Sequence, residues 1–282
     1  KIYTKFTGDD PRKVPMRITP GVHYSMGGAW VDYPASDDKD KGERFRHMSN
    51  LKGCFVIGEA DYLYHGANRL GANSLISCIF SGLVAGVDAL RYLEGVEEVE
   101  EKALSGLFHQ AVEKEEMRKE ALLGGQGEEN VHRLHDELSE IMISSVTVKR
   151  DNESLKKAIE QIKEIKKRYQ NISIDDKESR LNQTYVFAHQ FDAMLELALV
   201  MAKGALLRDE SRGSHYKSDF PKKDDEHFLK ITMAEYIEGE EPKIFYEPVD
   251  LRYLDPIERD YTKAKRVKPK LKNVPEALDL PL

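Results

Sequence analysis

Residues 54–75, CFVIGEADYLYHGANRLGANSL, join an apolar run to a polar, glycine-rich loop and then to the start of an apolar helix. The run Cys54–Gly58 is typical of a short, fully buried strand. The stretch Leu70–Val87 carries no charged side chain and predicts a buried helix. Its expected core stripe consists of Leu75, Ile79, Leu83, Val87 and Leu90. Strand, loop and buried helix in this order indicate part of a nucleotide-binding α/β layer.

The uncharged stretch Leu70–Val87 could also be interpreted as a membrane-spanning helix. A span needs ~20 predominantly apolar residues. The uncharged stretch has 18 residues, is interrupted by several glycines and serines, and lies between Arg69 and Asp88. A buried helix therefore fits the pattern better than a transmembrane helix.

Composition narrows the classes of function. The 282 residues contain 43 Lys and Arg against 50 Asp and Glu, which gives a net charge of −7. The chain therefore lacks the excess of basic residues that is typical of nucleic-acid-binding proteins. The 2 cysteines, Cys54 and Cys78, form no C-x-x-C pair. A disulfide framework and a Cys-rich zinc site are excluded, and no metal site is predicted.

The rest of the chain predicts helices followed by strands. Amphipathic spacing and caps indicate four helices, which short connections would arrange as an antiparallel bundle. A β-hairpin is expected after them. The predicted segments are Glu97–Glu120, Val131–Ile143, a helix capped at Asp151 or Asn152, Arg180–Leu207, and the strands Phe228–Tyr236 and Lys243–Val249. The expected inward residues include Leu134, Leu138, Ile159, Ile162, Phe191, Leu195 and Met201.

The predicted fold class is α/β + α. Residues 1–96 are expected to form part of a Rossmann-like nucleotide-binding domain, 97–218 a helical domain, and 219–282 a small β-hairpin region with a tail.

The chemistry-bearing residues lie in two segments. Glu59, at the end of the predicted strand, is placed to bind sugar or ribitol hydroxyls. Free N–H groups at the helix start, near Asn73 and Ser74, favour negative charge. Arg69 can grip a carboxylate through two parallel hydrogen bonds. By pattern alone, a purely structural loop with Arg69 paired to an aspartate is an equally good interpretation.

Longer blocks resemble a known family, the flavoprotein subunits of succinate dehydrogenase and fumarate reductase. They are Pro20–Gly28, Gly58–Glu59, His65–Leu75, Arg208–Tyr216 and Asp219–Asp225. Their order suits the later part of such a subunit, and the resemblance covers most of this chain. It implies that residues 1–96 are the C-terminal part of an FAD-binding and substrate domain. Aspartate oxidase is an alternative with a similar loop, although Leu70-Gly71-Ala72-Asn73-Ser74 is the succinate dehydrogenase form.

The resemblance implies roles for individual residues. His23 and Arg69 would contact a dicarboxylate, succinate or fumarate, and His65 would help to shape the pocket. Glu59 and the backbone N–H groups of Ser74 and Leu75 would bind FAD. The reaction would be hydride transfer between the substrate and flavin N5.

The resemblance also implies partners and leaves parts of the family pattern unmatched. An iron–sulfur subunit and membrane anchor subunits would hold the protein at the cytoplasmic face of a bacterial inner membrane. The family's Gly-x-Gly-x-x-Gly loop and proton-shuttle arginine have no match in this sequence, so no catalytic residue is assigned and the chain is interpreted as a C-terminal half. A truncated assembly fragment without catalysis is the alternative. Arg208, Arg212 and His215 are expected to pin the helical domain to the flavin domain.

Overall fold

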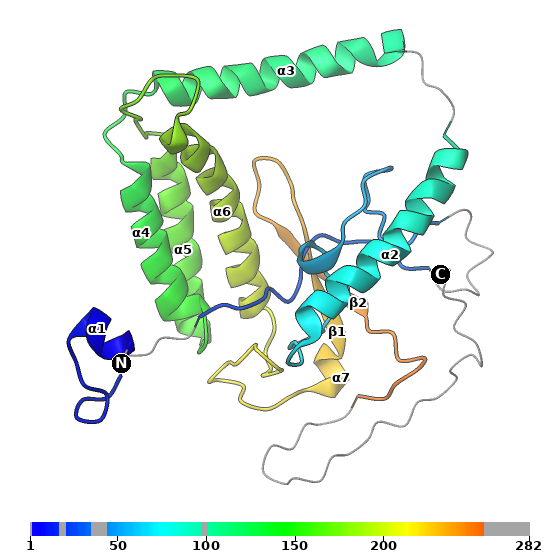
Figure 1. Cartoon of the computed structure of the whole chain (residues 1–282), viewed down its shortest axis with the longest axis vertical. Helices are drawn as coiled ribbons and strands as arrows, with labels where there is room; N and C mark the ends of the chain where they lie inside the picture. The colour runs from blue at the N-terminus through cyan, green and yellow to red at the C-terminus, as the bar shows by residue number, and fades with distance from the viewer. Residues whose placement is uncertain (1, 17–20, 35–43, 97–100, 257–282) are drawn as a thin grey trace. The chain divides into compact units, whose positions relative to one another are not determined.

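The computed structural model describes residues 2–16, 21–34, 44–96 and 101–256. The chain divides into two compact units, Lys1–Val96 and Glu97–Leu282 (Figure 1). We call them the N-terminal unit and the helical unit. The further boundary at residues 218 and 219 remains a prediction.

The N-terminal unit contains little regular structure apart from one long helix. Its elements are α1 (Ile2–Thr7), the 3-10 turn η2 (Gly58–Ala60) and α2 (Asn73–Glu94). The predicted strand Cys54–Gly58 is wrong, because only Phe55 pairs, in an isolated antiparallel bridge with Met48. No neighbouring strand exists among the described residues of this unit to extend that bridge into a ladder, so the Rossmann-like sheet is not seen.

Helix α2 buries the face opposite to the one predicted. Its buried residues are Ser77, Ser81, Val84, Ala85 and Asp88. Apart from Val84, these side chains are small or polar, and they bind the preceding loops: Gly58 N–H donates to Ser81 Oγ at 2.9 Å, and Arg46 pairs with Asp88 at 2.9 Å. The expected core residues Leu75 and Leu83 are 73% and 62% exposed, and Ile79 and Leu90 are exposed as well.

Helix α2 is also the one helix of the described residues that is long and apolar enough to cross a membrane. Its mean hydropathy reaches 1.5, and 28% of that window is buried. Core helices of soluble proteins share this length and composition, so these properties do not distinguish the two environments.

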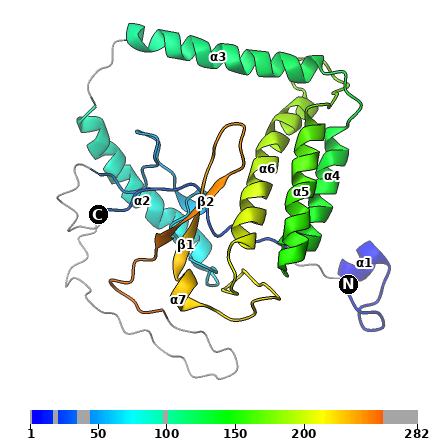
Figure 2. The ribbon, with the colours of Figure 1, turned by 180° about the vertical axis from the view of Figure 1, so that it is seen from behind.

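The helical unit has a continuous apolar core. Helices α4 (Val131–Ile141), α5 (Asn152–Tyr169) and α6 (Gln183–Leu206) lie side by side in both views (Figures 1 and 2). The turn η3 (Met142–Val146) follows α4. The side chain of Asp151 caps α5, as predicted. The core includes Leu134, Leu138, Ile159, Ile162, Phe191 and Leu195, whereas Met201 is exposed.

The predicted four-helix bundle is reduced to three helices. Helix α3 (Glu101–Gly124) runs across one end of the other helices instead of alongside them (Figure 1). Leu122 packs against the core and Arg118 pairs with Asp192 of α6 at 2.6 Å, but Leu107, Phe108 and Val112 are exposed. The contact of α3 is confined to its last turns because the preceding turns carry no sustained apolar stripe.

The predicted β-hairpin is confirmed. Strands β1 (Lys230–Glu235) and β2 (Lys243–Pro248) pair antiparallel with Met233 opposite Phe245. The short helix α7 (Asp225–Phe228) precedes them. The hairpin packs on α6, where Tyr246 Oη donates to the carbonyl of Leu207 at 2.8 Å.

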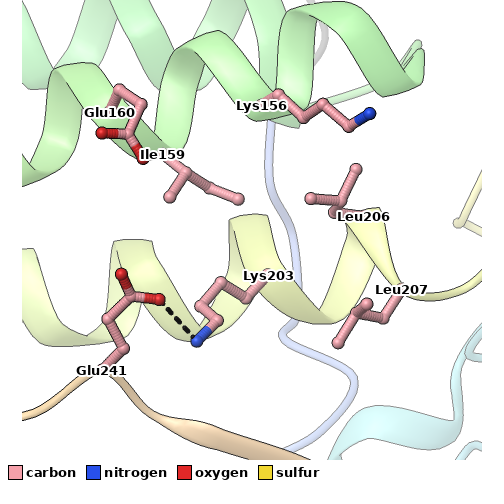
Figure 3. Close-up of a pocket in the computed structure, with 7 residues that line it drawn as sticks. All are labelled: Lys156, Ile159, Glu160, Lys203, Leu206, Leu207 and Glu241. Atoms are coloured by element: carbon pink, nitrogen blue, oxygen red, sulfur yellow. Dashed lines mark hydrogen bonds and ion pairs between the residues drawn. The ribbon is translucent and has the colours of Figure 1, made fainter.

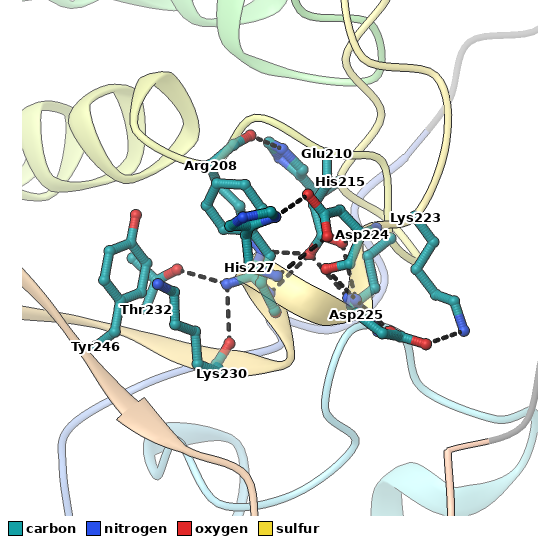
Figure 4. Close-up of polar contacts among 12 residues, drawn as sticks. Arg208, Glu210, His215, Lys223, Asp224, Asp225, His227, Lys230, Thr232 and Tyr246 are labelled. Carbon is teal, nitrogen blue, oxygen red and sulfur yellow. Dashed lines mark hydrogen bonds and ion pairs between the residues drawn. The ribbon is translucent and has the colours of Figure 1, made fainter.

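The expected pinning of two domains by Arg208, Arg212 and His215 is not what the described contacts show. Glu210 is fully buried and accepts hydrogen bonds from both arginines, at 2.9 and 2.8 Å (Figure 4). Arg208 also donates to the carbonyl of Lys230 and to Thr232 Oγ1, both at 2.9 Å. These partners all belong to the helical unit, so the cluster ties the end of α6 to the hairpin.

Candidate functional site

The two segments singled out in the sequence meet in the N-terminal unit. Arg69 and His23, which are 46 positions apart, lie with Nη2 and Nδ1 2.8 Å from each other. A guanidinium is only a donor, so His23 Nδ1 accepts this hydrogen bond and the proton of the neutral ring is on Nε2. Both side chains therefore present N–H donors in one place. This is a suitable arrangement for a carboxylate.

Arg69 has unused hydrogen-bonding capacity. Its Nη1 donates to the carbonyl of Leu70 at 3.2 Å, whereas its buried Nε has no partner among the described residues. The guanidinium lies 5.5 Å from the ring centre of Tyr24, a cation–π contact that fixes its plane. An unpaired buried N–H is costly, and an anion bound beside it would remove that cost.

Tyr24 is a residue of this site for which sequence reasoning predicted no role. It is buried, and its ring packs edge-on against His65 with ring centres 5.0 Å apart. The only signal for Tyr24 was its place beside His23 in the same motif. Its burial links the two predicted segments.

His65 is held from the other side by α2. A ring nitrogen, Nε2, lies 3.0 Å from Ser77 Oγ. Burial, and secondarily the charge of Arg69, lower the pKa of His65. His65 is therefore predominantly neutral near pH 7. Its backbone has φ of 72°, and Gly66 follows with φ of 52°, so the chain turns sharply into the Arg69 loop.

The residues predicted to bind FAD also lie in this unit. Glu59 Oε1 accepts a hydrogen bond from Ser25 N–H at 2.8 Å, which joins the Glu59 turn to the His23 motif. Ser74 and Leu75 lie in the first turn of α2, and the residue before this helix, Ala72, provides no side-chain cap. Asn73 N–H donates to the carbonyl of Leu70, whereas the N–H groups of Ser74 and Leu75 have no acceptor within the helix and can serve an electron-rich group of a cofactor, which fits the expectation for FAD.

Comparisons with known proteins place both units of the chain among flavoprotein sequences. A model described as an FAD binding domain matches residues 2–75, and one described as fumarate reductase flavoprotein C-term matches residues 135–261. The chain is 46% identical to the succinate dehydrogenase flavoprotein subunit of Bacillus subtilis over 269 residues, which is 95% of this chain and 44% of that protein. The chain is related to the flavoprotein subunits of succinate dehydrogenase and fumarate reductase.

More distant members of the family extend the relationship to solved structures. The fumarate reductase flavoprotein subunit of Haemophilus influenzae is 33% identical over 93% of this chain and 41% of its own length. An E. coli quinol fumarate reductase variant superposes with a TM-score of 0.78 at 29% identity, over 91% of this chain and 42% of the solved chain. The chain thus spans less than half the length of the relatives that it matches.

The helical unit contains a separate hollow of about 260 Å³ between α5, α6 and the hairpin loop (Figure 3). Glu241 pairs there with Lys203 at 2.8 Å and also with Lys163. These two lysines lower the pKa of Glu241 to about 2. None of the predicted site residues lines this hollow, and these paired charges join the hairpin loop to two helices.

Proposed function

We propose that this chain contributes part of the FAD and dicarboxylate site of an enzyme that interconverts succinate and fumarate. The observation that carries the proposal is the meeting of Arg69 and His23 over Tyr24, with a buried Arg69 Nε still lacking a partner. The kinship with succinate dehydrogenase and fumarate reductase subunits supports the same assignment.

In this proposal the residues of the chain hold the substrate. The guanidinium of Arg69 takes one carboxylate through parallel N–H donors, and His23 Nε2–H adds a further donor. With one end fixed, the central C–H bonds of the dicarboxylate have a defined position, and such positioning lowers the barrier strongly. Tyr24 keeps the guanidinium plane in place.

The cofactor is assigned to neighbouring residues. Glu59 would bind hydroxyls of the ribitol chain, and the N–H groups of Ser74 and Leu75 would face the electron-rich edge of the flavin ring. Bound FAD supplies the acceptor for the hydride that succinate loses. The position of Glu59, bonded to Ser25 in the His23 motif, supports placing cofactor and substrate next to each other.

The proposal includes partners. Several relatives are named as subunits, and one similar solved structure is a quinol–fumarate reductase with menaquinol molecules. We therefore propose that the protein works with an iron–sulfur subunit and a membrane anchor, peripherally at the cytoplasmic face of a membrane.

The decisive experiment replaces Arg69 by lysine in the complete flavoprotein within its complex. Lysine keeps the charge but loses the planar two-point grip. We expect kcat/KM for succinate to fall on the order of a hundredfold, with flavin absorbance retained. The matched control is Arg91→Lys, because Arg91 is an exposed α2 residue paired with Asp88. Near-normal efficiency of Arg69→Lys would contradict the assignment.

A further inference from the structure

A second polar cluster, which the proposed function does not use, lies within the N-terminal unit. The side chains of His47 and Asp61 are both 0% exposed, with Nδ1 and Oδ2 3.7 Å apart. On the other side of the imidazole, Nε2 lies 3.1 Å from Tyr64 Oη. At 3.7 Å the His47 and Asp61 atoms are too far apart for a hydrogen bond, and neither has another partner among the described residues. Buried polar atoms that lack a partner call for an explanation.

The direction of the hydrogen bond follows from the surroundings. Burial raises the pKa of Tyr64, so its hydroxyl keeps its proton and donates. Burial likewise lowers the pKa of His47. An interaction with the backbone of Val56 and the charge of Asp88 oppose this shift, whereas the charge of Arg46 acts in the same direction. His47 is therefore neutral, accepts from Tyr64 at Nε2 and directs its Nδ1–H toward Asp61.

The three residues surround the segment that leads into the substrate loop. Asp61 Oδ1 accepts from Leu63 N–H at 2.9 Å, and the backbone of Asp61 pairs with Ala29, next to the His23 motif. Tyr64 directly precedes His65, where the backbone turns with positive φ. The His47 side chain thus contacts both ends of residues 61–64. It does so from a backbone position that is itself bonded to Asp32 and Val56 at 2.8 and 2.9 Å.

We propose that His47 is a positioning residue for the dicarboxylate site: through Tyr64 and Asp61 it holds the His65–Arg69 loop in the geometry that places Arg69 beside His23. The inference rests on the proposed function and extends it to a residue that touches neither substrate nor cofactor.

Continuous packing connects His47 with Arg69. The ring centres of Tyr64 and His65 are 6.3 Å apart, and those of His65 and Tyr24 are 5.0 Å apart. Tyr24 in turn lies under the Arg69 guanidinium at 5.5 Å. A shift of Tyr64 is therefore passed directly to the residues that support the guanidinium. Loss of the Tyr64–His47 bond would therefore loosen the support of the guanidinium and weaken substrate binding.

The test uses Tyr64→Phe in the complete flavoprotein within its complex, because this change removes only the hydroxyl. We expect KM for succinate to rise about fivefold, as for the loss of one hydrogen bond, while kcat changes less than about twofold and flavin content is unchanged. The matched control is Tyr92→Phe, since Tyr92 of α2 packs on Phe45 and Phe55 in the same unit. It should leave KM unchanged.

A pair of variants at His47 separates positioning from simple packing. The glutamine amide of His47→Gln can accept from Tyr64 and donate toward Asp61, so KM should stay within about twofold of the wild type. His47→Leu fills the space but can neither accept from Tyr64 nor present a donor to Asp61, and it should raise KM at least as much as Tyr64→Phe. If the leucine variant does not fold, Tyr64→Phe and the glutamine variant decide alone.

The results that would overturn the inference differ from those that would overturn the proposed function. An active wild-type complex in which Tyr64→Phe has the KM of Tyr92→Phe overturns this inference and leaves the proposed function standing. Lower flavin content in Tyr64→Phe with an unchanged KM of the flavin-loaded fraction also overturns it. A wild-type complex that neither oxidises succinate nor reduces fumarate overturns the proposed function, and this inference with it.

Discussion

Gly28 lies where the His23 motif and the Glu59 turn touch through their backbones. A Cβ at this position would be 2.2 Å from the carbonyl oxygen of Ala60, closer than any real contact. The neighbouring Ala29 N–H donates to that same carbonyl at 2.8 Å. Glycine at residue 28 is therefore a requirement of the close approach that brings Arg69 and His23 together.

We predict that Gly28→Ala pushes the two segments apart. Forced overpacking of this kind costs typically about 1–3 kcal/mol of stability. Activity should fall together with the melting temperature, because the displaced segment carries His23. Gly21→Ala is the control, since a Cβ there meets nothing within 4 Å. Thermal melting and succinate kinetics of both variants check the prediction, and equal melting temperatures would show that the backbone contact is dispensable.

Glu59 is predicted to serve the cofactor rather than the substrate. Replacing it with alanine removes the carboxylate that would bind ribitol hydroxyls, and also the acceptor for Ser25 N–H. Flavin content per protein should fall, while KM for succinate of the flavin-loaded fraction changes little. Glu94→Ala, at the exposed end of α2, provides the comparison. Full flavin occupancy with a selectively raised KM would assign Glu59 to the substrate instead.

At the scale of elements, the end of α6 is closed by a buried lysine. Lys217 Nζ donates to the carbonyls of Ala205 and Leu206 at 3.1 and 2.8 Å, and it pairs with Asp209 at 2.7 Å. A cation suits a helix C-terminus, where the last carbonyls have no partner within the helix. These bonds fold the 209–217 turn back onto α6.

Lys217→Met should therefore destabilise the helical unit although methionine fills similar space. It takes the Lys217 donor away from two carbonyls and a carboxylate, which costs about 2 kcal/mol or more. Lys223→Met is the matched control, because Lys223 pairs with Asp225 at a more exposed position. Urea unfolding followed by far-UV circular dichroism measures both. Similar midpoints for the two variants would show that Lys217 does not stabilise the end of α6.

The same turn predicts a pH dependence. His215 contacts Arg150 and lies 3.0 Å from the carbonyl of Arg208; burial, with nearby cations, lowers its pKa to about 4. An unfolded histidine titrates near pH ~6.5, so the unfolded chain binds a proton first as the pH falls. Stability from this group is present above about pH 6.5 and is lost between that value and about pH 4.

His215→Asn should flatten the fall in melting temperature across that interval, because asparagine does not titrate. His109→Asn, at an exposed residue of α3, should keep the slope of the wild type. Carboxylates such as Glu210, whose pKa is lowered by its arginines despite burial, act in the same direction at lower pH. An unchanged slope in His215→Asn would contradict the assignment of the interval to His215.

On the scale of the whole molecule, the two units differ in how far their sequence predicts their structure. In the helical unit, residues such as Leu134, Ile162 and Phe191 are buried against neighbouring helices of the same unit, so amphipathic spacing predicts the helices well. Helix α2 was predicted to exist, but its buried face was assigned to its leucines. The buried face instead includes Ser81, which accepts from Gly58 N–H, and Ala85, and hydropathy alone does not identify either of them.

The residues of the candidate site were likewise predicted only in part from the sequence. The sequence blocks predicted His23, Arg69 and Glu59 as a group, and the structure brings His23 to Arg69 and Glu59 to the His23 motif. Their roles toward substrate and FAD remain predictions. His47 and Tyr64 could not be identified from sequence, because a contact between residues 17 positions apart, made by single side chains, leaves no periodic pattern.

The apolar face of α2 has a consequence for the behaviour of the 282-residue polypeptide. Its exposed residues are Leu75, Ile76, Ile79, Leu83, Leu90 and Leu93. A contiguous apolar surface of this kind promotes association.

We predict that this polypeptide self-associates in dilute buffer and binds a hydrophobic dye through α2. The double substitution Ile79→Glu with Leu83→Glu should reduce both effects, because two carboxylates interrupt the stripe without touching the buried face at Ser81 and Val84. Leu181→Glu is the control, since Leu181 is a fully exposed leucine in the helical unit, away from α2 in the sequence. Light scattering and dye fluorescence at equal protein concentration measure the outcome, with far-UV circular dichroism to verify helix content. If Leu181→Glu reduces association as much as the double variant, added negative charge rather than the α2 face is responsible.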